Sequence, residues 1–337
     1  MPGTGSIARA ALAAAVLLTA GCSDPSTGGG PPDAGSPPSD DATWTSTDPV
    51  DASGLIWASE GVVHLSDGTT IDVGGPLTSY VVAGDGVWFT PADSEDAGTE
   101  HSTVTTGPLH FADRDGEVTD TGLTVYVESI GASPDGRYLG LVDATSGPED
   151  DVSGTPQATA VVVDLSSGER VVDTTDGMGD LAEDDLAHDY PEVHLSVRFP
   201  DAESAYVEGL GENRLYALPG GDSEVVDPID SPVHDPLDRT NHDGTWTIDD
   251  RGDEEVLLSA DGKRVRPRTG TSQWELGWWQ DARTVVAAAS DGGASTLVTC
   301  VVPSGDCTPV EGTAGLLLRF PEGVAPSPAV DLGGGGE

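Results

Sequence analysis

The chain has 337 residues, of which 36% are hydrophobic and 22% are charged, so it has enough apolar residues to build a core, and wholesale disorder is excluded. Its 14 Lys and Arg residues stand against 59 Asp and Glu residues, and the net charge of −45 argues against nucleic acid and anionic lipid head groups as partners. The 45 Gly and 25 Pro residues indicate many short segments joined by turns rather than long helices.

Residues 1–21 have the features of a signal peptide. Arg9 gives a weakly positive start, and residues 10–18 form an apolar run that is too short to span a bilayer as a permanent helix. The run ends in Leu-Thr-Ala-Gly-Cys22, which resembles the lipobox of bacterial lipoproteins, where lipid is attached to the cysteine. The resemblance implies a mature chain that begins at Cys22 and is lipid-anchored to the extracytoplasmic face of the cell membrane. An ordinary signal peptide followed by a chance cysteine is the alternative.

Two segments are too polar to build a core. Residues 22–53 are rich in Ser, Gly, Pro and Asp, which is typical of a disordered tether between the lipidated cysteine and a folded domain. Trp44 lies in this tether and is expected to be exposed. Residues 321–337 have the same character and predict a disordered tail.

The body of the chain, residues 54–320, predicts an all-β domain. Short runs rich in β-branched and aromatic residues alternate with turns that contain Gly, Asp and Ser. The clearest predicted strands are residues 55–58, 62–65, 87–90, 138–142, 161–165 and 284–288.

One stretch carries a family resemblance. Residues 130–141 read IGASPDGRYLGL, and residues 160–172 read AVVVDLSSGERVV. This pair resembles the repeat of WD40-like and TolB-like β-propellers. The resemblance implies that residues 133–136 turn between the innermost strand of a blade and the next, and that residues 164–168 form the outer hairpin. Blades of roughly 40–50 residues predict a propeller of six or seven four-stranded blades. A β-sandwich is the alternative.

The two ends of the domain predict how the ring closes. The first unit, residues 55–73, has three predicted strands, and residues 315–320 form a last apolar strand that stands alone. We expect this strand to complete the first blade, because closure removes exposed sheet edges.

Cys300 and Cys307 bracket a predicted tight turn in a chain that is expected to be exported. Oxidising conditions and a hairpin geometry favour a disulfide between them. Cys22 is then left unpaired, in agreement with lipidation. A zinc site would need further ligands at suitable spacing, and none lie nearby in the sequence.

The sequence contains no strong catalytic or metal-binding motif. Two stretches combine His and Asp, and each is read either as solvated loop residues or as a site at a channel mouth. The first contains Asp184, Asp185, His188, Asp189 and His194, and the second contains His234, Asp235, Asp238, His242 and Asp243.

Two other features have a structural and a functional interpretation. Residues 113–117 resemble part of a Ca²⁺ loop but fit a hairpin turn better. The late tryptophans are read as core between blades, with ligand stacking as the alternative; they are Trp246, Trp274, Trp278 and Trp279.

These features favour a monomeric, non-catalytic binding or scaffold protein at the cell envelope. We expect a protein, peptide or carbohydrate partner, contact with the membrane through lipid on Cys22, and no cofactor, metal or nucleic acid. No catalytic residue is assigned. The alternative is an envelope hydrolase or lyase with a His/Asp site at the mouth of the propeller channel.

Overall fold

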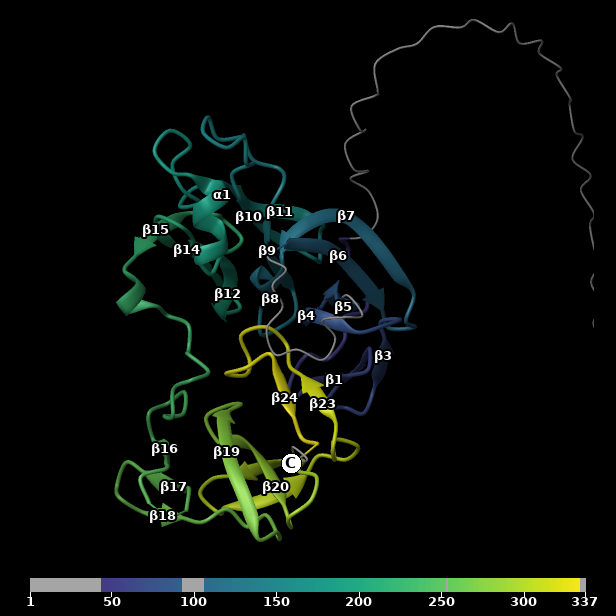
Figure 1. The fold of residues 1–337 in the computed structure, drawn as a ribbon, viewed down its shortest axis with the longest axis vertical. Coiled ribbons are helices and arrows are strands. Elements are labelled where there is room, and N and C mark those ends of the chain that lie inside the picture. Colours follow the sequence, from purple (N-terminus) through teal and green to yellow (C-terminus); the bar gives the residue numbers. More distant parts are fainter. Residues whose placement is uncertain (1–43, 93–105, 253, 334–337) are drawn as a thin grey trace, which may run out of the picture. The chain divides into compact units, whose positions relative to one another are not determined.

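The protein folds as antiparallel sheets in a β-propeller arrangement, which confirms the all-β prediction (Figure 1). The computed structural model describes residues 44–92, 106–252 and 254–333. Within these ranges the only helical segments are the single helical turn α1 (Leu186–Asp189) and the 3₁₀ turns η1 (Val127–Ser129), η2 (Tyr190–Glu192) and η3 (Pro228–Asp230). The alternative, a β-sandwich, consists of two packed sheets, whereas the described strands form five.

Five sheets contain the described strands. The first has the order β24-β23-β1-β2-β3, with β1 (Trp57–Ser59), β2 (Val62–His64), β3 (Thr70–Asp72), β23 (Leu317–Arg319) and β24 (Ala329–Asp331). The second has the order β11-β10-β9-β7-β6-β5-β4, with β8 beside β9; its strands are β4 (Leu77–Ala83), β5 (Gly86–Pro91), β6 (Thr106–Asp113), β7 (Val118–Tyr126), β8 (Gly131–Ala132), β9 (Tyr138–Asp143), β10 (Thr159–Asp164) and β11 (Glu169–Thr174).

The other three sheets are simple meanders, in which each strand pairs with the next along the chain. The third sheet contains β12 (Ser196–Asp201), β13 (Ser204–Glu208), β14 (Asn213–Ala217) and β15 (Ser223–Val226). The fourth contains β16 (Trp246–Asp249), β17 (Val256–Ser259) and β18 (Arg264–Val265). The fifth contains β19 (Gln273–Trp279), β20 (Thr284–Ser290), β21 (Thr296–Val301) and β22 (Asp306–Pro309).

The turns that carry the family resemblance form as predicted. Residues 133–136 connect β8 to β9, with the Gly136 amide donating to the Ser133 carbonyl and the Ser133 hydroxyl donating to Asp135. Gly136 has a φ of 69°, which glycine adopts at no steric cost. Residues 164–168 connect β10 to β11 in the predicted hairpin.

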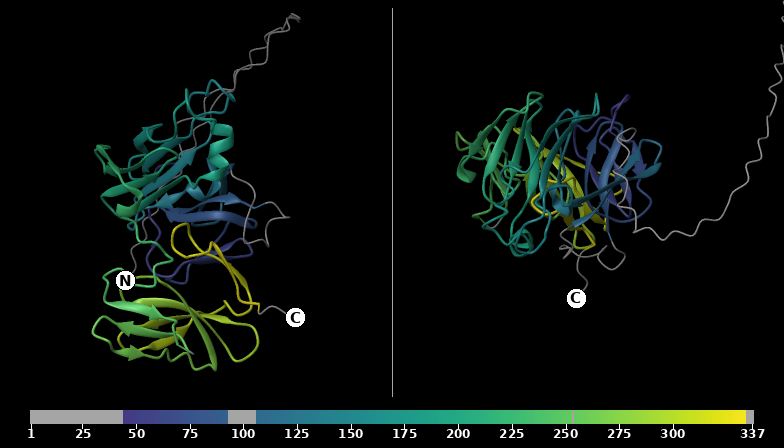
Figure 2. Two further views of the ribbon diagram at one scale, coloured as in Figure 1. Left: turned by 60° about the vertical axis from the view of Figure 1, so that its left-hand side comes forward. Right: turned by 90° about the horizontal axis from the view of Figure 1, so that it is seen from above.

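The last part of the chain pairs with the first strand, as the closure prediction requires. Ala58 of β1 lies opposite Arg319 of β23, and the Ser59 hydroxyl donates to the Leu317 carbonyl at 3.0 Å. Leu318 and Phe320 are fully buried there. Figures 1 and 2 show β23 and β24 in yellow beside the purple strands of the same sheet.

The prediction of a disordered tail from residue 321 is wrong as far as residue 333. The structure forms β24 in this segment, antiparallel to β23, and the Leu332 amide donates to the Leu316 carbonyl at 2.9 Å. Ala329 and Leu332 are buried. A polar segment is ordered here because a neighbouring strand supplies backbone partners and a few apolar side chains reach the core. Residues 334–337 lie outside the described part.

The predicted tether also ends earlier than residue 53. The Ser46 amide donates to the Leu165 carbonyl at 2.6 Å, and the Val50 amide donates to the Gly84 carbonyl at 2.8 Å. Val50 is buried. Trp44, which was expected to be exposed, is partly buried and stacks on Trp88 with ring centroids 5.1 Å apart. Residues 44–53 therefore belong to the folded domain, whereas residues 22–43 lie outside the described part.

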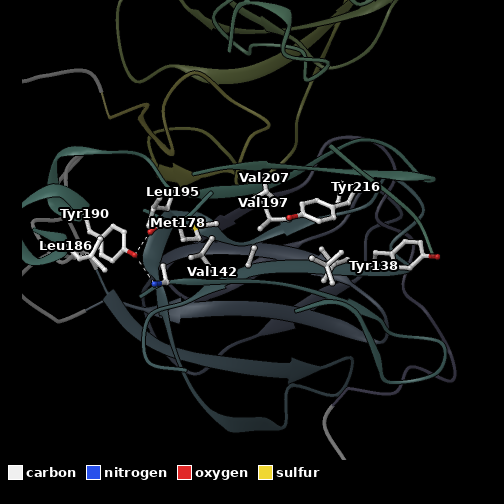
Figure 3. Close-up of a cluster of buried hydrophobic side chains, with 14 residues drawn as sticks. Tyr138, Val142, Met178, Leu186, Tyr190, Leu195, Val197, Val207 and Tyr216 are labelled. Atoms are coloured by element: carbon white, nitrogen blue, oxygen red, sulfur yellow. Dashed lines mark hydrogen bonds between the residues drawn. The ribbon is translucent and has the colours of Figure 1, made fainter. Parts of the chain in front are cut away.

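Adjacent sheets pack through continuous apolar clusters. The cluster drawn in Figure 3 joins β9 to β12 and β13, with Val142, Val197 and Val207 buried between them. A Cβ atom at Gly140 would approach Val197 to 2.3 Å, so only glycine allows this close contact. At the edge of the cluster, the Tyr190 hydroxyl donates to the Met178 carbonyl at 2.7 Å and accepts the amide of Ala158 at 2.9 Å.

The predicted disulfide between Cys300 and Cys307 is confirmed. The two cysteines are directly opposite each other in β21 and β22, with their Cα atoms 4.0 Å apart. Cys300 is fully buried in the core of the last sheet. The bond therefore joins an outer strand to a buried one.

The closure by β23 and β24 predicts a large effect of truncation. A chain that ends before Gly315 loses both strands and exposes β1 and the core around them, so we expect the melting temperature to fall by about 10 °C or more. Thermal unfolding followed by far-ultraviolet circular dichroism measures this. A chain that ends at residue 333 is the control and should melt like the full chain. An unchanged melting temperature in the shorter variant would show that closure contributes nothing.

Removal of the disulfide should have a smaller and separable effect. We expect the Cys300→Ala/Cys307→Ala double variant to lose about 2–3 kcal/mol in the free energy of unfolding, because the bond closes a short loop in the unfolded chain. Denaturant titration measures this loss. Reducing agent should destabilise the wild-type protein by a similar amount and leave the double variant unchanged. Equal sensitivity of the two proteins to reducing agent would contradict the prediction.

Candidate functional site

A cavity of about 530 Å³ is the strongest candidate site among the described residues. Its wall takes residues from β4, η1, β8, β12 and β19, from the segment before β1, from the segment before β16 and from the loop between β23 and β24. All five sheets therefore contribute to it, mostly through their first strands or the chain that leads into them. This is the size of a pocket that encloses a small molecule.

The segment before β16 brings two histidines to the cavity. His234 and His242 lie with their ring centroids 4.2 Å apart, and both line the cavity. The turn that contains His242 is built by Asn241, whose side-chain oxygen accepts the amides of Thr245 and Trp246 at 2.9 Å each. This is the local hydrogen bonding that favours Asn at turns.

Burial and the neighbouring ring act together on His234. Burial lowers the pKa of His234, and the nearby His242 lowers it further, while Asp238 and Asp235 oppose the shift. Among the described residues, the Nε2 atom of His234 is buried and finds no hydrogen-bond partner. A neutral imidazole has one donor and one acceptor nitrogen, so this residue of the cavity wall carries a polar atom that no described group satisfies.

The loop between β23 and β24 brings Glu322 to the same cavity. Its Oε1 atom is buried and has no hydrogen-bond partner in residues 44–92, 106–252 and 254–333, although the residue as a whole retains some exposure. Burial raises the pKa of Glu322 to about 8; Glu128 adds to the shift, and Arg198 and Arg319 oppose it. The backbone of the loop is fixed by the Glu322 amide, which donates to the Tyr80 carbonyl at 3.0 Å.

The remaining charged groups of the wall already have partners. Arg198 lies 3.6 Å from Glu208 and 3.5 Å from a ring nitrogen of His194. Glu128 lies 3.8 Å from the other ring nitrogen of His194. Asp281 accepts the backbone amides of Arg283 and Thr284 in the turn after β19. Glu322 and His234 therefore differ from these charged residues, because each has a buried polar atom without a hydrogen-bond partner among the described residues.

The structure separates the two predicted His/Asp groups. His234 and His242 converge on the cavity, but no hydrogen bond or ion pair joins either ring to a carboxylate within the described ranges. His188 is exposed and lies 3.9 Å from Glu192, and His194 contacts Glu128 and Arg198 instead. In the first group, Asp184 accepts the Asp180 amide, and Asp185 directly precedes α1. A catalytic His/Asp pair is therefore not assembled at either place.

Metal sites receive no support from the geometry. Residues 113–117 form the hairpin turn between β6 and β7, with Asp113 accepting the amides of Asp115 and Glu117, as the turn interpretation predicts. In the part of the chain that the structure describes, no group of three or more His, Cys, Asp or Glu side chains is placed to hold a metal ion.

The late tryptophans belong mainly to the core, as predicted. Trp278 and Trp279 are buried, and Trp246 and Trp274 pack on the core of the last two sheets. Trp279 also lines the cavity and donates through Nε1 to the Arg239 carbonyl at 2.9 Å. It thus provides one aromatic wall of the site.

Sequence reasoning missed Glu322, Glu128 and Arg198. Glu322 lies in the segment whose composition predicts a disordered tail, and that prediction leaves the residue exposed. The only signal was its position two residues after the apolar run of the closing strand, which draws the following loop inward.

Cys22, the predicted lipidation site, lies outside the described residues. Among the described residues, no helix has the length and apolar character needed to cross a bilayer.

No protein-family model matches the chain, and no curated protein matches it. Several solved structures are similar at low sequence identity. A prolyl endopeptidase structure is 15% identical with a TM-score of 0.36, over 81% of this chain and 44% of that one. A puromycin-hydrolyzing peptidase of Mycobacterium tuberculosis is 17% identical with a TM-score of 0.30, over 77% and 44%. The dihydro-heme d1 dehydrogenase NirN is 15% identical with a TM-score of 0.32, over 83% and 56%. The chain spans about half the length of these structures, and the similarities assign neither a family nor an activity to it.

Proposed function

We propose that this protein is an exported, lipid-anchored β-propeller that binds a small ligand in its central cavity without transforming it. One observation carries the proposal. Within the described part of the chain, the Oε1 atom of Glu322 and the Nε2 atom of His234 are buried, have no hydrogen-bond partner, and belong to residues that line one cavity. Leaving a buried polar group unpaired costs roughly 1–3 kcal/mol, and a ligand that hydrogen-bonds to both groups removes that cost.

The proposal takes the ring to have six blades. The eight-stranded sheet is joined between β7 and β9 by a single residue pair, Val125 with Asp143. It therefore divides into the meanders β4–β7 and β8–β11, each of four strands. With the other four sheets this makes six units, in line with the number expected from the length of the repeat. A channel surrounded by blades is a common place for a propeller to bind a ligand.

The proposed location rests on Cys22 and the signal-like segment before it. The disulfide between Cys300 and Cys307 supports export, because such bonds persist in oxidising compartments. We predict that Cys22→Ser abolishes lipidation and moves the protein from the membrane fraction to the soluble fraction of the cell envelope. Cys300→Ala is the control and should stay in the membrane fraction. Retention of the Cys22→Ser variant in the membrane would contradict the anchor.

An enzyme acting in the same cavity is the second candidate. The observation in its favour is that Glu322, with a pKa of about 8, is protonated at neutral pH and shares the cavity with neutral His234. A protonated carboxyl group is a suitable general acid in a hydrolase or lyase. Ser133 and Ser196 line the cavity, and their hydroxyls donate to Asp135 and Glu208, but within the described residues no histidine joins either pair as a general base, so binding is the better supported function.

Filling the cavity tests the binding function. Ala132 lines the cavity and is partly buried, whereas Ala187 is exposed in α1. The full chain, Ala132→Trp and Ala187→Trp are each incubated with an extract of small molecules from the native cell envelope, washed, and denatured, and the released compounds are identified by mass spectrometry. We expect at least one compound to be retained by the wild type and Ala187→Trp and to be lost, about tenfold or more, from Ala132→Trp.

Two results would decide against the proposal. If no compound depends on the open cavity while Ala132→Trp melts like the wild type, the cavity is not a binding site. If a retained compound is recovered chemically changed from the wild type and unchanged from Glu322→Gln, the enzyme replaces the binding protein as the better description.

A further inference from the structure

We infer that the ligand of the central cavity is a small organic cation, whose ammonium group lies against Glu322 and His234 and whose apolar part lies against the inner strands. This inference rests on the proposed function and names the chemical class of its ligand. It follows from the charge of the wall, from the two unpaired atoms, and from the apolar lining.

The charge of the wall favours a cation over an anion. The acidic residues that line the cavity are Glu128, Asp281 and Glu322, and the arginine in the same wall is Arg198. Arg198 is already paired with Glu208, which stands outside the lining. An anion would meet three carboxyl groups and one guanidinium, and among these groups the unpartnered atom belongs to the carboxyl group of Glu322. The whole chain adds to this preference, because its net charge of −45 raises the local concentration of cations.

The unpaired atoms suit donors from the ligand when Glu322 is ionised and the imidazole of His234 carries its proton on Nδ1. An ammonium group has three N–H donors and no acceptor, so it matches the carboxylate oxygen Oε1 of Glu322 and the Nε2 lone pair of that His234 tautomer. A hydroxyl group carries no charge, so it forms no ion pair with the carboxylate form of Glu322. Hydrogen bonds between an ammonium and a carboxylate are also about twice as strong as neutral ones.

The rest of the wall fits an apolar or aromatic body. Three buried apolar residues line the cavity, namely Val81 of β4, Ile130 and Val197 of β12. Trp279 and Phe199 add aromatic surface, which also attracts cations through the ring face. A polar cation without an apolar part would leave this surface unused.

Charge groups from four elements act on Glu322 and set how binding depends on pH. Glu128 of η1 raises its pKa, while Arg198 of β12 and Arg319 of β23 lower it. Tyr80 of β4 lies close by; burial raises its pKa well above the usual range, so its phenol stays neutral and donates to the Arg319 carbonyl at 3.1 Å.

Burial is the largest effect, and it leaves Glu322 mostly protonated below its pKa of about 8. A bound ammonium favours the carboxylate, so one proton leaves the carboxyl group for the buffer as the cation binds. Affinity should then rise about tenfold per pH unit below pH 8 and level off above it. His234, whose pKa is lowered, stays neutral over this range.

Calorimetry with three matched probes tests the inference on the full chain. The probes are 2-phenylethylammonium, 2-phenylethanol and phenylacetate, which share one ring and chain length and differ in charge. At about pH 8.5 we expect the ammonium to bind at least tenfold more tightly than either of the others. Its affinity should fall about tenfold between roughly pH 7.5 and 6.5. At pH 6.5, titrations in two buffers of different ionisation enthalpy should show about one proton released per ligand.

Two variants separate Glu322 from the general acidity of the protein. Glu322→Gln should weaken binding of the ammonium at pH 8.5 by about tenfold or more and abolish both the pH dependence and the proton release. Glu169→Gln, an exposed carboxyl group on β11, removes the same charge at the surface and should bind like the wild type. Melting temperatures show that both variants are folded.

The outcomes distinguish this inference from the function on which it rests. Three results would overturn the inference that the ligand is a cation. They are tighter binding of phenylacetate or 2-phenylethanol, failure of all three probes to bind at millimolar concentration, and unchanged binding of the ammonium by Glu322→Gln. Cavity-dependent retention of an envelope compound would still support a binding protein in those cases. Loss of that retention overturns the binding function itself.

Discussion

The pairing of β23 with β1 is the interaction on which the rest of the structure depends. It joins Ala58 and Arg319, which are separated in sequence by nearly the whole domain. It also adds β23 and β24 to the first sheet on the side of β1. Without it, β1 would be an open edge with unpaired backbone groups. The same pairing directs the chain after Phe320 into the cavity, because β24 must return antiparallel to β23. The position of Glu322 is thus a consequence of closure.

The burial of Glu322 costs free energy, because the described residues do not pair all of its polar atoms. A carboxyl group in a loop that closes a ring is taken out of water, and the guanidinium groups of Arg198 and Arg319 only partly compensate. Arg319 donates to the Thr78 carbonyl, and Arg198 pairs with Glu208. Because burial raises its pKa to about 8, the carboxyl group of Glu322 is mostly protonated at neutral pH. A positive charge that enters the cavity would lower the pKa of this carboxyl group and favour its ionised form.

Much of the fold could be predicted from local patterns, and little of the site could. The turn at residues 133–136 and the strand β9 follow from short-range preferences, namely Asp-Gly turns and runs of β-branched and aromatic residues. The disulfide between Cys300 and Cys307 follows from two cysteines across one hairpin. Glu322 and His234, in contrast, meet at the cavity from parts of the chain that are distant in sequence, and their chemistry comes from burial. Composition alone cannot report that burial.

The two wrong boundaries share one physical cause. Residues 44–53 consist mostly of Ser, Thr, Asp and Pro, and residues 321–333 are rich in Pro and Gly, and composition predicts that such segments bury too little to fold. Each is ordered by an existing sheet that supplies backbone partners, with a few apolar contacts such as Trp44 on Trp88 and Leu332 in the core. Ala52 and Gly54 even line the cavity. The end of the segment that leads from the proposed anchor into the domain is therefore part of the wall of the candidate site.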